Sequence, residues 1–440
     1  MSHRNLFVAL FVLAILGCSY SFLVAQTPPN RLPETILQEG SKDTPAIRPI
    51  GNTASVPTPG ISAAPSRRVP AVFDRFRSPD SSSESTWMSV KAARLGMDWL
   101  FRMQQPNGLF ITGYNPALNQ PTDGDQLTRQ AIAACALAHA ARSTGENRYT
   151  ARAAQAILTL LSETTLNDAG IRTPNTSANM PSKLAFTGML LRAICLLPEP
   201  AEDMIAKAEE LAQYLKSLLQ ADGSFKEEPG DNLTTAGMAV YGLVASQKLK
   251  PADWKLQALR STGTYYRTVF RSNPSPAQIG WMGPAYAEAF QLARETPFAE
   301  FVFEMNDWLC ALQFTQTESK YLIYRGGFRW GFDVKHLEPI PTLDSAQAVL
   351  SLSEAYKCMG MLQKPDAARL DKYKQALMRG CGFLERLQYS EDRTSHFVPT
   401  LRAYLIGAFF NNPTDGNIRI DQTSMACMAL TQFLASGAER

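Results

Sequence analysis

The sequence predicts an all-α domain of six helical hairpins closed into a ring, an (α/α)6 toroid. Three observations predict this fold: two classes of amphipathic helix alternate along residues 86–440, each repeat holds two helices, and there are six repeats. The second class is apolar almost all round. A helix of that kind must be covered on both flanks, which a closed ring provides and an open solenoid does not.

The more polar class supplies the predicted outer helices, at residues 87–104, 148–163, 201–219, 252–269, 297–313 and 366–388. The class that is richer in small and apolar residues supplies the predicted inner helices, at residues 125–141, 182–196, 231–246, 276–293, 342–358 and 420–436. Each outer helix and the inner helix that follows it form one hairpin.

Four outer helices end in a shared pattern, in which an aromatic residue and Leu precede a Gln. The first copy runs from Trp99-Leu100 to Gln104 and continues into Asn107-Gly108-Leu109-Phe110. The other copies end at Gln220, Gln313 and Gln388. We expect the aromatic residue and Leu to dock the helix, Gln to bind the carbonyls exposed at its end, and Gly to supply the turn.

This pattern resembles the repeat of the terpenoid-cyclase and prenyltransferase toroids, and the six-hairpin glycosidases, polysaccharide lyases and uronate epimerases share the architecture. The resemblance covers residues 86–440 and implies the fold. It does not imply cyclase activity, because Asp123-Gly124-Asp125-Gln126 holds only two acids of the Asp-x-Asp-Asp motif of squalene-hopene cyclases. The zinc ligands of the protein prenyltransferases also have no counterpart in order, and fold alone does not define function.

Residues 1–25 are typical of an export signal. Arg4 precedes an apolar run from Leu6 to Gly17, which is too short for a membrane span. Cys18 ends a lipobox-like sequence, so lipidation at Cys18, cleavage after Ala25 and an uncleaved anchor are alternatives. All three predict an extracytoplasmic domain, in the periplasm or at the cell surface, whose membrane contact is limited to this segment.

Residues 26–85 are rich in Pro, Ser, Thr and Ala and lack apolar periodicity, which predicts a disordered linker. The toroid domain should then occupy residues 86–440. Composition argues against nucleic acid as a partner, because 43 Lys and Arg stand against 40 Asp and Glu without a basic cluster. The six cysteines after Cys18 lie in apolar helical patterns and read as buried thiols, although their even number permits disulfides. We predict no metal and no cofactor, since no motif for either is present.

The loops locate the candidate site. Connections from inner to outer helices are short. Four of the six connections from outer to inner helices are long, at about 105–124, 164–181, 314–341 and 389–419. In a toroid these long loops share the rim where the inner helices begin, and long loops in compact domains are usually functional. Helix N-termini that converge at such a rim favour negative groups.

Five acids lie at or near the starts of inner helices: Asp123, Asp125, Asp231, Asp344 and Asp421. Any one of them alone could simply cap its helix, which stabilises by about 1 kcal/mol. Several carboxylates around one cavity, however, suit glycosidic acid–base chemistry. We therefore predict Asp125 and Asp421, followed by Asp344, as catalytic residues and the other two acids as substrate ligands.

The long loops add aromatic and basic side chains that could bind a sugar: Tyr114, Arg325, Trp330, His396, Arg402 and Tyr404. Aromatic rings stack on sugars, and Arg matches carboxylates or sulfates. With Arg172, Arg329 and Arg419 on the same loops, an anionic ligand is one expectation. Surface positions or packing within the loops are the alternative for each residue.

These features together predict an exported carbohydrate-active enzyme, a hydrolase, lyase or epimerase acting on an extracytoplasmic glycan or a small-molecule substrate. Because no complete catalytic motif is present, the alternative is a non-catalytic toroid that binds a glycan, peptide or protein at the cell surface.

Overall fold

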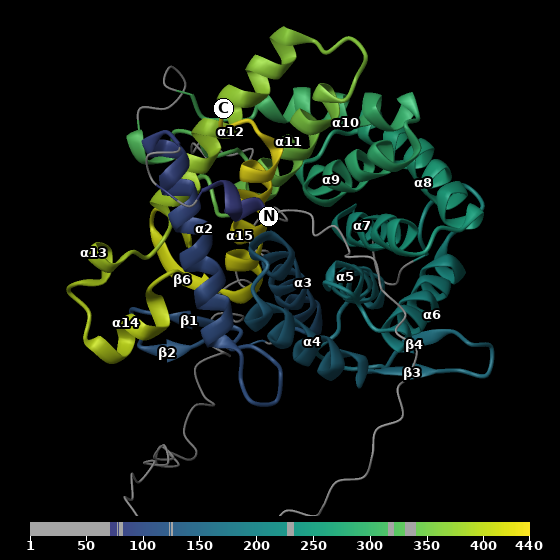
Figure 1. Cartoon of the computed structure of the whole chain (residues 1–440), viewed down its shortest axis with the longest axis horizontal. Coiled ribbons are helices and arrows are strands. Elements are labelled where there is room, and N and C mark those ends of the chain that lie inside the picture. The colour runs from purple at the N-terminus through teal and green to yellow at the C-terminus, as the bar shows by residue number, and fades with distance from the viewer. Residues whose placement is uncertain are drawn as a thin grey trace, which may run out of the picture. The chain divides into compact units, whose positions relative to one another are not determined.

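Six helices of the computed structural model form a closed inner ring: α3 (Leu127–Thr144), α5 (Lys183–Leu196), α7 (Leu233–Leu249), α9 (Pro276–Ala293), α11 (Ser345–Gly360) and α15 (Ile420–Ser436). Each contacts the next, and α15 contacts α3 (Figure 1). The structure describes residues 71–76, 78, 82–122, 124, 126–226, 233–315, 321–330 and 340–440, all within the compact unit 68–440.

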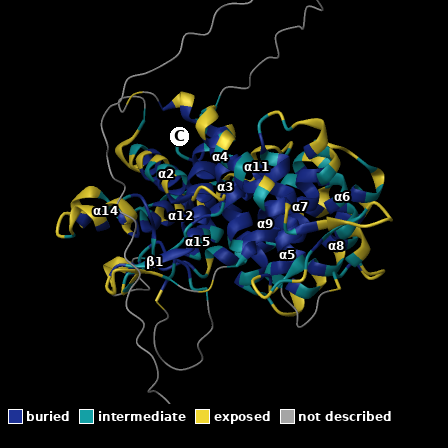
Figure 2. Ribbon diagram, turned by 90° about the horizontal axis from the view of Figure 1, so that it is seen from below, coloured by how far each residue is buried: buried dark blue, intermediate teal, exposed yellow. Residues whose placement is uncertain are grey.

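Six further helices form the outer layer: α2 (Glu84–Met103), α4 (Asn147–Leu161), α6 (Glu202–Leu218), α8 (Asp253–Ser272), α10 (Thr296–Cys310) and α12 (Ala367–Arg386). Buried residues concentrate on the inner helices (Figure 2). The predicted (α/α)6 toroid of six hairpins is confirmed. None of the helices in the described ranges has the length and apolarity needed to cross a membrane.

Small residues allow the inner helices to approach one another closely. A Cβ on Gly242 of α7 would lie 2.3 Å from the carbonyl oxygen of Gly188 in α5, so neither helix could come this near with a larger residue at that position. Cys135, Cys195, Cys358, Cys381 and Cys427 are buried free thiols, as predicted, and Cys310 is a half-buried free thiol. The ring is thus tightly packed by its own small side chains.

The repeated Gln joins each hairpin to its neighbour. The side-chain amide of Gln104 donates to the carbonyl of Gly108 at 2.9 Å, inside its own turn, and to the carbonyl of Arg152 in α4 at 2.9 Å. Gly108 has a φ of 88°, in the left-handed region that favours glycine. The predicted turn is confirmed, and the Gln also bridges to the next outer helix.

The same arrangement recurs twice. Gln313 bonds to the carbonyl of Ala376 in α12 at 2.9 Å, and Gln388 bonds to that of Ala92 in α2 at 2.9 Å. The second bond joins the last hairpin to the first and so helps to close the ring. Gln388 also donates to the carbonyl of Gly407 at 3.0 Å. Gly407 is the turn glycine of this repeat, and it lies nineteen residues after Gln388.

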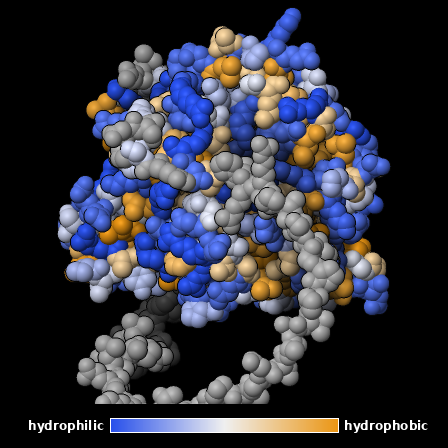
Figure 3. Space-filling model, in the orientation of Figure 1, coloured by the Kyte–Doolittle hydropathy of each residue, from blue (hydrophilic) through white to orange (hydrophobic). Residues whose placement is uncertain are grey.

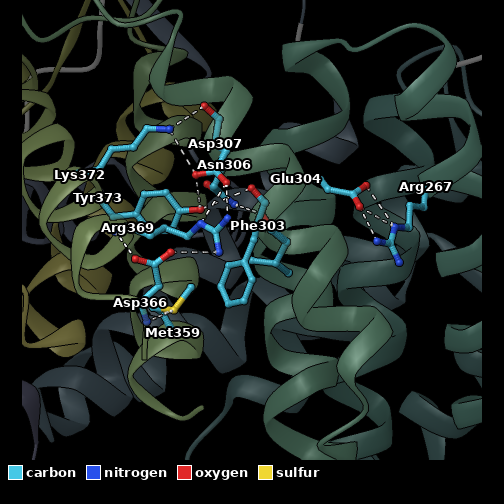
Figure 4. Close-up of polar contacts among 11 residues, drawn as sticks. Arg267, Phe303, Glu304, Asn306, Asp307, Met359, Asp366, Arg369, Lys372 and Tyr373 are labelled. Atoms are coloured by element: carbon cyan, nitrogen blue, oxygen red, sulfur yellow. Dashed lines mark hydrogen bonds and ion pairs between the residues drawn. The ribbon is translucent and has the colours of Figure 1, made fainter. Parts of the chain in front are cut away.

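Ion pairs join neighbouring outer helices on the surface (Figure 4). Arg267 of α8 donates to Glu304 of α10, with an Nε–Oε2 distance of 3.1 Å. Asp307, also in α10, accepts from Arg369 Nε at 3.0 Å and from the Tyr373 hydroxyl at 3.1 Å, both in α12. These partly exposed pairs add little stability one by one, but they hold the outer layer in register.

The long loops fold into short strands and helices: β1 (Gly113–Asn115), β2 (Gln120–Pro121), β3 (Thr164–Leu166), β4 (Arg172–Pro174), η3 (Leu322–Tyr324), α13 (Glu391–Thr394), α14 (Pro399–Leu405), β5 (Phe410–Asn412) and β6 (Asp415–Arg419). β3 and β4 form a hairpin, and the other strands form one sheet in the order β2-β1-β6-β5. This sheet joins the loop of the first hairpin to that of the last.

One predicted boundary is wrong. Residues 71–76 were assigned to the disordered linker, but η1 (Val72–Arg75) packs against α3 and α15. Phe73 is 2% exposed and Phe76 is 6% exposed, so two aromatic anchors tie this segment to the core. The predicted signal segment at 1–25, Cys18 and the linker up to residue 70 lie outside the described residues.

Candidate functional site

The rim where the inner helices begin carries the candidate site. Outer and inner helices run antiparallel within each hairpin, so all six inner helices point the same way. In Figure 2 the C-terminus, just beyond α15, and strand β1, beside the start of that helix, lie on opposite sides of the domain. The four-stranded sheet therefore belongs to the rim where inner helices begin. Its strand β6 leads directly into α15.

Asp421 lies in the first turn of α15 and is held by arginines. Arg419 binds both carboxylate oxygens of Asp421. Its Nε donates to Oδ1 at 3.1 Å, and its Nη2 donates to Oδ2. Arg129 of α3 adds a third contact, with its Nε 3.9 Å from Oδ2. The Asp421 side chain is 14% exposed, so this ionised carboxylate is shielded but still open to the rim.

Asp344 lies at the start of α11, yet it does not cap that helix. Its carboxylate makes no bond to the helix N–H groups, and accepts instead from the Thr342 hydroxyl at 3.0 Å. Burial raises the pKa of the Asp344 carboxyl, and the charge of Asp421 raises it further, against the opposing effects of Thr342 and Arg419. For Asp344 the capping interpretation is therefore wrong.

Asp344 and Asp421 interact electrostatically, but their environments differ. Asp421 is neutralised by a two-point arginine pair, whereas Asp344 is desolvated and faces the charge of Asp421. This difference keeps a proton on Asp344 to higher pH than on an ordinary aspartate, with an ionised carboxylate close by. Two acids separated in this way can divide the roles of proton donor and base.

Polar residues that the sequence analysis missed support this neighbourhood. The backbone N–H of Leu343 donates to the carbonyl of Asn411 in β5 at 2.7 Å, which fixes the segment before Asp344. The Asn411 side chain also accepts from Gln422 Nε2 at 3.0 Å. Arg129 could have been found from the sequence, because it is a charged residue near the start of an otherwise apolar inner helix. Asn411 carries no such signal.

Tyr114 and Tyr404 form a separate aromatic pair. Their rings stack with centroids 5.2 Å apart and planes 8° apart. Tyr114 pairs with Ile418 across the sheet, and Gly113 pairs with Arg419. Since side chains alternate along strands, Tyr114 and Arg419 lie on opposite faces of the sheet. The stacked rings and the Arg419 side chain, which holds Asp421, therefore lie on opposite sides of the β1–β6 ladder.

The Tyr404 ring is anchored although it is 40% exposed. Its backbone carbonyl accepts from Trp99 Nε1 at 2.7 Å. The hydroxyl of Tyr114 beneath it donates to Asn119 at 2.7 Å. A rigid exposed ring of this kind can stack on a sugar with little loss of entropy.

The other predicted binding residues are dispersed. His396 is exposed and contacts Phe397, with ring centroids 4.1 Å apart and planes tilted by 38°. Trp330 is half-buried against the core. Gly326, next to Arg325, packs on the Arg379 backbone of α12, which places this turn against an outer helix. The structure shows none of these residues in contact with Asp344 or Asp421 in the ranges it covers.

Of the remaining predicted residues, the structure describes Arg402 but not the three other acids. Arg402 lies on α14, and its buried Nε finds no hydrogen-bond partner within the part of the chain that is described. Asp123, Asp125 and Asp231 fall outside the described residues. Among the described residues, no group of three or more His, Cys, Asp or Glu is arranged to hold a metal ion.

The comparisons with known proteins agree on the fold. D-mannose isomerase aligns with a TM-score of 0.59 at 11% identity, covering 80% of this chain and 99% of that one. Cellobiose 2-epimerase from Bacillus thermoamylovorans aligns with a TM-score of 0.59 at 10% identity, covering 79% and 97%.

An inactive variant of the alpha-1,6-mannanase of Salegentibacter sp. HEL1_6, in complex with alpha-1,6-mannotriose, aligns with a TM-score of 0.56 at 10% identity, covering 79% and 99%. No family model matches the chain, and no curated protein matches it by sequence. The chain therefore shares with these enzymes the (α/α)6 toroid fold of the six-hairpin glycosidase-like architecture.

Proposed function

We propose that this protein is an exported carbohydrate-active enzyme whose Asp344 and Asp421 act together on a glycan at the rim where the inner helices begin. The main support is that the two acids have different environments: Asp344 is desolvated, and Asp421 is held by Arg419. The fold supports a glycan as substrate, because the proteins of similar structure include D-mannose isomerase, cellobiose 2-epimerase and an alpha-1,6-mannanase. Export rests on the signal-like segment at residues 1–25.

Each acid has a chemical role in this proposal. Asp344, with its raised pKa, donates a proton to the leaving or ring oxygen of the sugar. Asp421, held in its pair with Arg419, serves as base, nucleophile or stabiliser of developing positive charge. Arg419 is a positioning residue, since it fixes both oxygens of Asp421.

Neutral glycans are the first substrates to test. The anionic ligand expected from the loop arginines has less support, because two of them are engaged by acids of the protein. Arg172 of β4 pairs with Glu210 of α6 at 2.8 Å, and Arg419 pairs with Asp421. A uronate would have to compete with these carboxylates for the same guanidinium groups.

The experiment is a screen of the purified chain against neutral and uronate-containing oligosaccharides, followed by Asp344→Asn and Asp421→Asn on any substrate found. Each substitution should lower kcat by about 10²- to 10⁴-fold, the range for loss of a general acid or base. Asp203→Asn is the matched control, because Asp203 is an exposed acid on outer helix α6 paired with Lys207 at 2.7 Å.

Full turnover in both rim variants would remove these acids from the mechanism. Glycan binding without turnover in the wild-type chain would support the alternative, a non-catalytic toroid.

A further inference from the structure

The opposite end of the ring, where the inner helices finish, contains a second polar cluster. All six inner helices place a polar or charged side chain in their last two turns, namely Arg142, Arg192, Lys248, Glu288, Glu354 and Gln432. Short connections leave this end without long loops. Buried charges cost several kcal/mol each unless they are paired, so such a cluster needs an account of its own.

Arg192 and Glu288 form the centre of this cluster. Arg192 Nη2 donates to Glu288 Oε1 at 2.6 Å and Nη1 donates to Oε2 at 3.2 Å. The Arg192 guanidinium also lies 3.2 Å from the centre of the Tyr241 ring. Arg192 is only 3% exposed, yet its Nε has no hydrogen-bond partner among the residues described. One donor of a buried cation is therefore left over after the ion pair is made.

A cavity of about 220 Å³ adjoins this pair. Its lining consists of Arg142, Arg192, Cys195, Leu196, Ala245, Lys248, Leu249 and Glu288. At about 30 Å³ per water, the space corresponds to roughly seven waters. It is smaller than the roughly 300 Å³ at which pockets for drug-sized ligands begin, so it suits a small molecule and excludes an oligosaccharide.

The charge of the lining favours an anion. Arg142, Arg192 and Lys248 against Glu288 leave a formal charge of +2 (three cations less one anion). Leu196 and Leu249 mark the C-terminal ends of α5 and α7, and Arg142 lies in the last turn of α3, so three helix ends contribute roughly half a negative charge each. The balance is about +0.5, slightly positive. Arg142 already offsets part of one helix end, because its Nε donates to the carbonyl of Leu196 at 2.7 Å.

Lys248 completes the arrangement at the mouth. Its side chain is exposed, and it makes no hydrogen bond to the residues that the structure describes. Lys248 and Arg192 thus bring two cationic side chains from neighbouring helices, α7 and α5, to the lining of the same small cavity. Two cationic donors around a space of this size match the geometry of an oxyanion.

We propose that this cavity is a binding site for a small oxyanion of about the size of phosphate. The site is separate from the acid pair and lies at the other end of the inner helices. Glu288 opposes an anion, but its two oxygens accept from Arg192, and the exposed Lys248 supplies a further positive charge to the lining.

The test measures the thermal unfolding midpoint and calorimetric binding of the full chain in sodium phosphate, against sodium chloride of matched ionic strength. Phosphate should bind and raise the midpoint more than chloride does. Lys248→Gln should weaken phosphate binding by about tenfold, since it removes a charged hydrogen-bond donor from an exposed position. Lys250→Gln is the matched control, an exposed lysine just past the same helix end that does not line the cavity.

An effect of phosphate no larger than that of chloride would overturn the proposal, as would equal affinity in the Lys248→Gln variant. Loss of the phosphate effect in Arg419→Gln, which removes the cation that holds Asp421, would place the anion at the rim and also overturn it. A full response in Arg419→Gln would support a site independent of the proposed enzymatic function.

Discussion

The two ends of the ring use charge in opposite ways. At the rim where inner helices begin, Asp421 and Arg419 stand on loops and first turns, and the Arg419 side chain is 39% exposed. At the other end, Arg192 and Glu288 lie within helices, with Arg192 only 3% exposed. At the rim the acids and their arginines remain available for protons and a glycan. At the other end the Arg192–Glu288 pair joins two inner helices, and the exposed Lys248 beside it is the charge open to water. The face shown in Figure 3 is largely hydrophilic, with apolar residues scattered over it.

The largest expected effect on stability comes from breaking the buried pair. Arg192→Met leaves Glu288 as an uncompensated buried charge and should lower the free energy of unfolding by about 3–5 kcal/mol. Arg419→Met, the corresponding change at the rim, should cost less, because Arg129 still lies 3.9 Å from the remaining Asp421 carboxylate. Chemical denaturation of both variants measures the difference. Equal losses at the two ends would break the comparison.

A smaller effect is expected from the repeated Gln that frames the rim. Gln388→Leu removes the buried amide that donates to the carbonyls of Gly407 and Ala92, so it should destabilise by about 2 kcal/mol. Gln220→Leu changes the same repeat position where the Gln is exposed and its side-chain amide donates to the carbonyl of Leu218 at 3.2 Å, so it should change stability little. The same denaturation measurement applies. If both variants were equally stable, the bridging bonds would not hold the rim together.

Much of the fold could be predicted from the sequence because it depends on local periodicity. The predicted inner helices at 276–293 and 420–436 coincide with α9 and α15. The sheet could not be predicted, since β1 pairs with β6 across about three hundred residues and each strand is too short to show alternation. The folded segment at residues 71–76 was missed because two isolated aromatic residues in a proline-rich stretch give no periodic signal.

The candidate site was predictable in part for a topological reason. The ring brings the starts of all inner helices to one rim, and this placed Asp344 and Asp421 in the same neighbourhood before any coordinates. The environment of each acid was not predictable, because it depends on Thr342 and on a two-point contact with Arg419. The cluster at the other end was also missed, although Arg192 interrupts an otherwise apolar helix and could have been a signal.

The assignment of Asp344 as proton donor beside an ionised Asp421 is tested most directly by 13C NMR titration of the aspartate carboxyl groups in the full chain. The Asp344→Asn variant identifies the resonance of Asp344. In the wild-type protein Asp344 should titrate above the ordinary aspartate value of 3.8. In Asp421→Asn its pKa should fall, because the substitution removes the negative charge that raises it and leaves the positive charge of Arg419 that lowers it. Titration at or below 3.8 in the wild type, or an unchanged pKa in Asp421→Asn, would contradict the paired roles of these two acids.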